Sequence, residues 1–84
     1  MEWVPVDSRA FAAVAYEDGK HQLCIRFHSG KIYCYFDFPR YQYDELLAAD
    51  SKGTYFADHI RGKFLYEEVG DGHMRPHLVY SSGR

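Results

Sequence analysis

The sequence predicts an α+β domain in which a three-stranded antiparallel β-meander is followed by two helices packed on one face. Two glycine-containing pairs, Asp18-Gly19 and Ser29-Gly30, separate three runs of β-forming residues, as tight hairpin turns do. Pro39 then precedes a segment with helical spacing of its apolar residues, and proline is well tolerated in the first turn of a helix. A chain of 84 residues has room for one core, so a single domain is expected.

The central hairpin, residues 21–36, determines which side chains are expected inside. If Ser29 and Gly30 alone form the loop, Ile25 lies opposite Cys34 and Cys24 opposite Tyr35. Side chains alternate between the two faces of a strand, so one face is then an apolar core face. In this register the core face carries Leu23, Ile25, Phe27, Ile32, Cys34 and Phe36, and the other carries Cys24, Arg26, His28, Lys31, Tyr33 and Tyr35.

The first strand is predicted from Phe11 to Glu17. Pairing Glu17 with Lys20 places Val14 opposite Leu23, which extends the same apolar face. Both hairpins therefore agree on the face that is buried.

Cys24 and Cys34 point to opposite faces in this register, so no disulfide between them is expected. Reduced thiols are also the usual state in the cytoplasm.

The first helix is predicted over Arg40–Ala49, and a second, shorter helix over Tyr55–Arg61. Ser51 or Thr54 is the expected N-cap of the second helix, and Gly62 its C-cap.

Residues 64–69 are expected to form a last extended segment that covers the first helix. The domain is thus expected to span residues 1–69, followed by a flexible tail over 70–84. A short docked strand at Leu78–Tyr80 is the less favoured alternative.

Composition excludes several classes of function. The formal net charge of −2 is not that of a strong nonspecific nucleic-acid binder, although a local basic patch is compatible with it. No apolar run has the length of a membrane span, and the N-terminus lacks the features of a signal peptide. A cytoplasmic protein without membrane contact is expected.

A spaced pattern of residues extends over most of the chain. It consists of the run FAAVAY at 11–16, Leu23, Phe27, Gly30, Tyr33, Tyr35, Pro39, Tyr43, the run LLAA at 46–49, Ser51-Lys52-Gly53, Tyr55-Phe56, Ile60-Arg61 and Tyr66. This pattern resembles the KTSC domain over about residues 6–69. That family occurs at the C-terminus of some lysyl-tRNA synthetases and as free-standing small proteins in bacteria and their phages. The resemblance implies a domain of unestablished function for which RNA binding has been suggested. This sequence departs from the family pattern at Phe38 and Ala57.

Tyr33 and Tyr35 are the leading candidates for a binding surface, because residues two apart on a strand point the same way. Exposed rings on a sheet stack nucleobases while basic groups hold phosphates. The alternative is that these tyrosines cover the second side of the sheet by packing across strands. The candidate RNA-binding set is Tyr33, Tyr35, Arg26, Lys31 and His28, joined by Lys52 and Arg61.

Two classes of partner remain open for this surface. One is RNA, either tRNA or a single strand. The other is a protein, because tyrosine and arginine are enriched in interface hot spots and the net charge is acidic. The sequence leaves the oligomeric state undecided.

Other chemistry has weaker support. Ser51-Lys52-Gly53-Thr54 before a helix is either an anion site or simply a turn with a cap. His73 and His77 have metal-ligand spacing but Gly72 and Pro76 oppose a helix there, so no metal site is expected. The sequence offers no convincing nucleophile and base, so we expect no enzyme activity, no catalytic residues and no cofactor.

Overall fold

The computed structural model describes residues 2–69 and 78–80. Within this part of the chain, six antiparallel strands form one sheet in chain order, β1-β2-β3-β4-β5-β6. The α+β class is therefore confirmed, whereas the count of three strands is wrong. The elements are β1 (Val4–Pro5), β2 (Phe11–Glu17), the 3-10 turn η1 (Asp18–Lys20), β3 (Gln22–Phe27), β4 (Ile32–Tyr35), α1 (Arg40–Ala48), α2 (Lys52–His59), β5 (Leu65–Val69) and β6 (Leu78–Tyr80).

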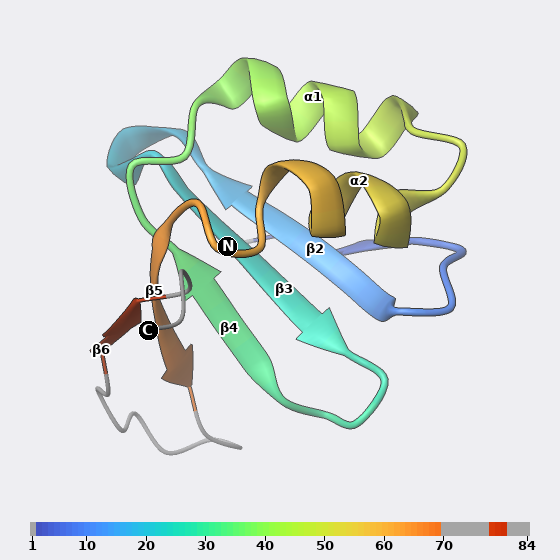
Figure 1. Cartoon of the computed structure of the whole chain (residues 1–84), viewed down its shortest axis with the longest axis horizontal. Coiled ribbons are helices and arrows are strands. Elements are labelled where there is room, and N and C mark those ends of the chain that lie inside the picture. The colour runs from blue at the N-terminus through green and yellow to red at the C-terminus, as the bar shows by residue number, and fades with distance from the viewer. Residues whose placement is uncertain (1, 70–77, 81–84) are drawn as a thin grey trace.

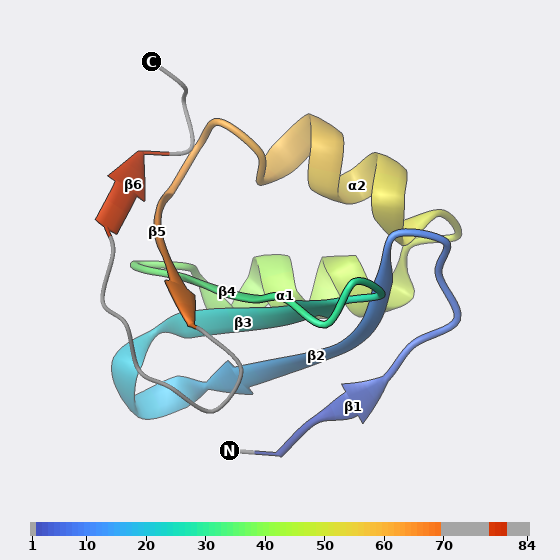
Figure 2. The ribbon, with the colours of Figure 1, turned by 90° about the horizontal axis from the view of Figure 1, so that it is seen from below.

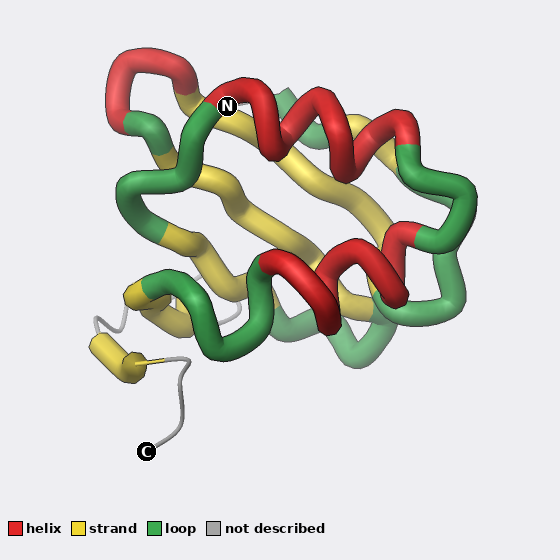
Figure 3. Tube along the Cα trace, turned by 45° about the horizontal axis from the view of Figure 1, so that its top comes forward, coloured by secondary structure: helices red, strands yellow, loops and turns green. Residues whose placement is uncertain are grey.

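Both helices lie on one face of the sheet formed by β2, β3 and β4, as predicted (Figure 1). The sheet curls at β5, which rises from the plane of β4 toward α2 (Figure 2). The two helices run beside each other across this face (Figure 3). The core lies between the layers and consists of Phe11, Val14, Leu23, Ile25, Tyr35, Phe38, Tyr43, Leu46, Phe56 and Ile60.

The extra strands come from the C-terminal half of the chain and from the N-terminus. The segment expected to cover the first helix instead extends the sheet, since β5 pairs with β4 and places Tyr66 opposite Tyr35. Leu78–Tyr80 forms β6 against β5, which is the alternative that the sequence favoured less. The rest of the predicted flexible tail, residues 70–77 and 81–84, lies outside the described residues.

The connection between β2 and β3 is longer than a two-residue turn. It contains η1 and His21, whose φ of 50° is left-handed and whose N–H donates to the Asp18 carbonyl. Glu17 therefore pairs with Gln22 and Val14 with Ile25, a shift of two residues from the predicted register. Because side chains alternate with a period of two, this shift leaves Val14 and the residues of β2 that follow it on their predicted faces. A bulge between Phe11 and Ala13 changes the register at the start of β2, so Phe11 lies in the core together with Val14.

The connection between β3 and β4 has three residues rather than two, and this reverses β4. The N–H of Phe27 donates to the Lys31 carbonyl, while the N–H of Gly30 donates to the Phe27 carbonyl. Gly30 has a φ of 96°, the left-handed geometry typical of the last residue in a three-residue hairpin loop. Cys24 therefore lies opposite Cys34 rather than Tyr35, a shift of one residue.

A shift of one residue moves every side chain of β4 to the other face. The prediction that Tyr33 and Tyr35 share an open face with Arg26 is therefore wrong. Tyr35 is a member of the core, and Tyr33 is partly buried against it. Ile32 and Cys34, which were predicted in the core, lie on the other face with Cys24 and Arg26.

The same register joins the two cysteines, contrary to the sequence prediction. Cys24 and Cys34 face each other directly, with Cα atoms 4.0 Å apart, and form a disulfide. Both residues are buried, as are Ala13 and Ala15 on the same face of the neighbouring strand. This face is thus not the open surface that the sequence suggested.

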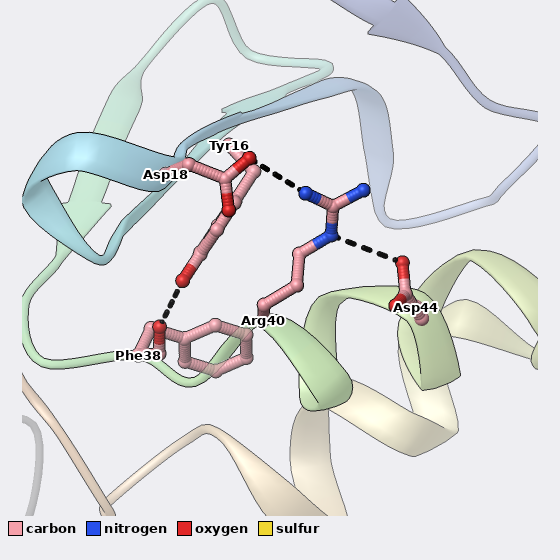
Figure 4. A network of polar contacts seen from close by, with 5 residues as sticks. All are labelled: Tyr16, Asp18, Phe38, Arg40 and Asp44. Carbon is pink, nitrogen blue, oxygen red and sulfur yellow. Dashed lines mark hydrogen bonds and ion pairs between the residues drawn. The ribbon is translucent and has the colours of Figure 1, made fainter.

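The first helix begins at Arg40, as predicted, directly after Pro39. Its first residue fixes it to the β2–β3 turn, because the Arg40 guanidinium donates to Asp18 at 2.6 Å and to Asp44 at 3.3 Å (Figure 4). The Arg40 guanidinium lies 5.8 Å from the ring centres of Tyr16 and Tyr43, and these two rings stack with centroids 5.1 Å apart. The Tyr16 hydroxyl donates to the Phe38 carbonyl at 2.6 Å.

The second helix begins three residues earlier than predicted. Ser51 is its N-cap, since the Ser51 hydroxyl accepts from the Thr54 N–H at 3.3 Å. Lys52 and Gly53 therefore fill the first turn instead of preceding the helix. Gly62 follows the helix with a φ of 77°, consistent with its predicted role in ending it.

The disulfide provides a direct test of this arrangement. Replacing both Cys24 and Cys34 by alanine should lower the free energy of unfolding by about 2–3 kcal/mol, because a cross-link with this loop length restricts the unfolded chain. Urea unfolding of the oxidised protein and of the double variant measures the difference. A chain whose oxidised and reduced forms have equal unfolding midpoints would contradict this role.

Candidate nucleic-acid interface

A cleft of about 330 Å³ lies between residues of α2 and residues of β3, β4 and β5. Its walls come from the end of β3, from β4, from α2 and from β5, and the turn after α2 contributes a cation. The lining residues are Phe27, Tyr33, Tyr35, Phe56, Arg61 and Tyr66. Three residues that the sequence singled out, Tyr33, Tyr35 and Arg61, are therefore brought together, although not on an open sheet.

The rings in this cleft form a continuous aromatic wall. The Tyr66 ring lies 5.1 Å from that of Tyr33 and 5.3 Å from that of Tyr35, measured between centroids. Phe56 of α2 lies edge-on, 5.9 Å from both Phe27 and Tyr35. Contacts of this kind hold aromatic side chains in fixed orientations, so the wall is formed before any ligand binds.

Burial and neighbouring charges set the electrostatics of the cleft. Burial is the main cause that raises the pKa of Tyr35 well above its ordinary value, and the phenols of Tyr66 and Tyr33 raise it further. The Arg61 guanidinium acts in the opposite direction. Burial is also the main cause that raises the pKa of Tyr33, and the negative charge of Glu68 raises it further. The phenols of Tyr33 and Tyr35 therefore stay protonated and available as hydrogen-bond donors at neutral pH.

Arg61 is the cation of the cleft. Its side chain is exposed, and its guanidinium lies 5.8 Å from the centre of the Phe56 ring. Among the described residues it forms no ion pair, in contrast to Arg40. Its charge is thus available to an anionic ligand.

The other basic candidates lie elsewhere. The Arg26 guanidinium lies 4.6 Å from the centre of the Trp3 ring, on the opposite face of the sheet from Tyr33. A ring nitrogen of His28 lies 2.7 Å from the Ser8 carbonyl oxygen. Lys31 is exposed in the β3–β4 turn. The structure thus does not gather the predicted basic residues on one aromatic face.

Lys52 belongs to a second cavity, at the start of α2. This cavity has a volume of about 380 Å³ and includes Asp7, Asp50 and Ser51 in its lining. The Lys52 ammonium donates to the Ala49 carbonyl at 2.9 Å, and two carboxylates share the cavity. The segment therefore combines a helix cap with mixed charge, which favours the turn-and-cap interpretation over an anion site.

Sequence reasoning missed the contribution of Phe27, Phe56 and Tyr66 to this cleft. Each was recognised as an apolar or aromatic position, but their meeting depends on β5 joining the sheet beside β4. A strand pairing across thirty residues leaves no local signal in the sequence.

Two further predictions concern metals and membranes. The part of the chain that the structure describes contains no group of three or more metal-ligating side chains. His73 and His77 lie outside it. No helix among residues 2–69 has the length and apolar character needed to cross a membrane.

Comparison with known proteins decides the family. The family model of the KTSC domain matches residues 7–64. The chain belongs to the KTSC family. The predicted resemblance is thus confirmed, and the cleft-lining residues Phe27, Tyr33, Tyr35, Phe56 and Arg61 fall inside the matched segment.

Known proteins of two kinds are similar in sequence to this chain. A lysine–tRNA ligase of Trichormus variabilis is 44% identical over 54 residues, which is 64% of this chain and 10% of the ligase. A lysine–tRNA ligase of a Nostoc species is 44% identical over 57 residues, 68% of this chain and 10% of the ligase. The chain thus spans about a tenth of the length of these ligases. A protein of Tsukamurella paurometabola is 35% identical over 60 residues, which cover 71% of this chain and 90% of that protein.

A solved structure supports the same fold. The crystal structure of a KTSC domain protein from Yersinia pestis superposes with a TM-score of 0.80 and 30% sequence identity. The match covers 82% of this chain and 97% of that protein. The KTSC fold of this chain is therefore shared with a solved KTSC domain protein, and sequences similar to it form about a tenth of larger ligases.

The buried phenol of Tyr35 predicts a loss of stability at alkaline pH. A tyrosine ordinarily ionises near pH 10, whereas the folded protein holds the Tyr35 proton to higher pH. Above about pH 10 the unfolded chain therefore binds fewer protons than the folded one, and the free energy of unfolding falls as pH rises. Below about pH 10, the stabilisation that the protonated Tyr35 phenol gives the folded protein is fully present.

Urea unfolding midpoints between about pH 8 and pH 11 measure this effect. Tyr35→Phe should show a smaller decline across this range than the unmodified protein, because it removes the phenol while keeping the ring. Identical declines in the two proteins would show that Tyr35 does not carry the effect.

Proposed function

We propose that this KTSC domain is a noncatalytic RNA-binding module that contacts RNA through the aromatic cleft. The observation that carries the proposal is the meeting of Tyr33, Tyr35 and Tyr66 with Arg61 at one opening. Arg61 has no ion-pair partner within residues 2–69 and 78–80. Rings that stack bases, together with cations that hold the backbone, are the two components of single-strand recognition.

Exposed cations on both adjoining turns support the proposal. Lys31 lies in the turn that joins Phe27 to the strand carrying Tyr33, and Lys63 lies in the turn that follows Arg61. A backbone that passes over the cleft therefore has phosphate partners on either side. The net charge of −2 favours a few local phosphate contacts over a basic surface that covers the whole domain. Arg26, His28 and Lys52 are not part of the proposed interface, because other groups of the domain already hold their side chains.

The relatives favour RNA as the partner class. Two of them are lysine–tRNA ligases, so an unpaired segment of a tRNA or of another RNA is the ligand we propose. A cytoplasmic location belongs to the same proposal. The Cys24–Cys34 disulfide is unusual in that compartment, and its buried position protects it from soluble thiols.

A protein partner is the second candidate function. It is favoured by the composition of the cleft, where five rings accompany a single cation, because interface hot spots are rich in tyrosine and arginine. Binding through such a surface depends little on salt, whereas phosphate contacts weaken steeply as salt is added.

The RNA proposal predicts a specific effect of Arg61→Ala. This change should weaken the binding of short single-stranded RNA and reduce the slope of log affinity against log salt by about one, which corresponds to one lost phosphate contact. Fluorescence anisotropy at several salt concentrations measures both quantities. Lys20→Ala is the matched control, because Lys20 is an exposed cation of the β2–β3 turn and does not line the cleft.

The control should bind with nearly unchanged affinity and slope. Absence of RNA binding by the unmodified protein at low salt would contradict the proposal and favour a protein partner. Equal losses in the Arg61 and Lys20 variants would show that RNA does not use the cleft.

A further inference from the structure

The hydroxyl of Tyr35 has an unusual position. Tyr35 is 2% exposed, yet its hydroxyl forms no hydrogen bond with the residues that the structure describes, although buried polar groups are normally paired. Every fully buried side-chain nitrogen or oxygen in this part of the chain has a partner. The Tyr35 hydroxyl therefore still reaches solvent, and the cleft that Tyr35 lines is its opening.

Two more phenols in the cleft have hydroxyls without a hydrogen bond to the described residues. Tyr33 and Tyr66 also line the cleft, and within the described ranges their hydroxyls have no hydrogen-bond partner either. Their phenols act electrostatically on that of Tyr35, so the polar ends of the three rings lie near one another. The cleft thus combines apolar ring faces with several unused donors and acceptors.

The charges beside the cleft have opposite signs at its two sides. Arg61 supplies a guanidinium at one side. Glu68 lies opposite Tyr33 in the β4–β5 ladder, and its negative charge acts on the Tyr33 phenol. An anion deep in the cleft would be repelled by this carboxylate, whereas a neutral ring with amino and carbonyl groups would not. An aliphatic ligand would leave the hydroxyls unsatisfied.

A neutral, planar, hydrogen-bonding ring meets all of these conditions. We propose that the cleft is a pocket for one unstacked nucleobase of a bound RNA, held against the rings of Tyr33 and Tyr66. The base edge bonds to the Tyr35 hydroxyl, and Arg61 binds the adjoining phosphate. This inference rests on the proposed RNA-binding function and adds to it that one base enters the domain.

The test uses a short single-stranded RNA and a series in which each nucleotide in turn is replaced by an abasic one. One abasic position should weaken binding about tenfold, which is the contribution of one stacked base, while the others have smaller effects. Tyr35→Phe should weaken binding of the intact RNA and leave binding of that abasic RNA unchanged. Tyr41→Phe is the control, since Tyr41 is an exposed tyrosine of α1.

A second measurement separates failure of this inference from failure of RNA binding. Nuclear magnetic resonance titrations compare the four ribonucleoside monophosphates with ribose 5-phosphate, which lacks a base. Saturable shifts at Tyr33, Tyr35 and Tyr66 with a nucleotide but not with ribose 5-phosphate support the pocket, even if longer RNA does not bind. If RNA binds but abasic substitution and Tyr35→Phe have no effect, RNA binding stands and the base pocket is wrong. Absence of shifts with all four nucleotides also overturns the pocket.

Discussion

The three-residue turn between β3 and β4 is the constraint on which the rest of this structure depends. It places Cys24 directly opposite Cys34 and turns Tyr33 and Tyr35 toward the helices. With one residue fewer in the turn, both tyrosines would face away from the core, and the cysteines would lie on opposite faces. The disulfide then reinforces the register that the turn selects, because it joins a pair that exists only in that register.

The second half of the chain supplies the remaining walls of the aromatic cleft. β5 joins the sheet beside β4 and brings Tyr66 against Tyr33 and Tyr35, while Phe56 of α2 closes the other wall. The position of the helical layer is fixed at its far end by Arg40, which bonds to the β2–β3 turn. The aromatic cleft is therefore a product of the whole fold, and it lies where the core of the domain opens to solvent rather than on a flat sheet surface.

The sequence predicted the parts of the fold that depend on local patterns. Three of these predictions were right: the strand Phe11–Glu17, the start of the first helix at Arg40, and the packing of both helices on one face of the sheet. The register error of two residues at the turn Asp18–His21 did not change which face the side chains of Val14 and Ile25 occupy. An error of one residue at Ser29-Gly30 moved the proposed site to the wrong face. Hairpin loops of two and three residues both accept a glycine, so the sequence could not distinguish them. Tyr66 was missed because its pairing with Tyr35 is a long-range contact.

The register of β3 and β4 is tested most directly by the distances between their backbone protons. In an antiparallel pair, the α-protons of directly opposed residues in a non-hydrogen-bonded position lie close together. A nuclear Overhauser spectrum of the labelled domain should therefore show a cross-peak between the α-protons of Cys24 and Cys34, and another between those of Arg26 and Ile32. In the register of a two-residue loop, the close α-protons would instead be those of Ile25 with Cys34 and of Phe27 with Ile32. Those cross-peaks would place the tyrosines on the other face and contradict the cleft.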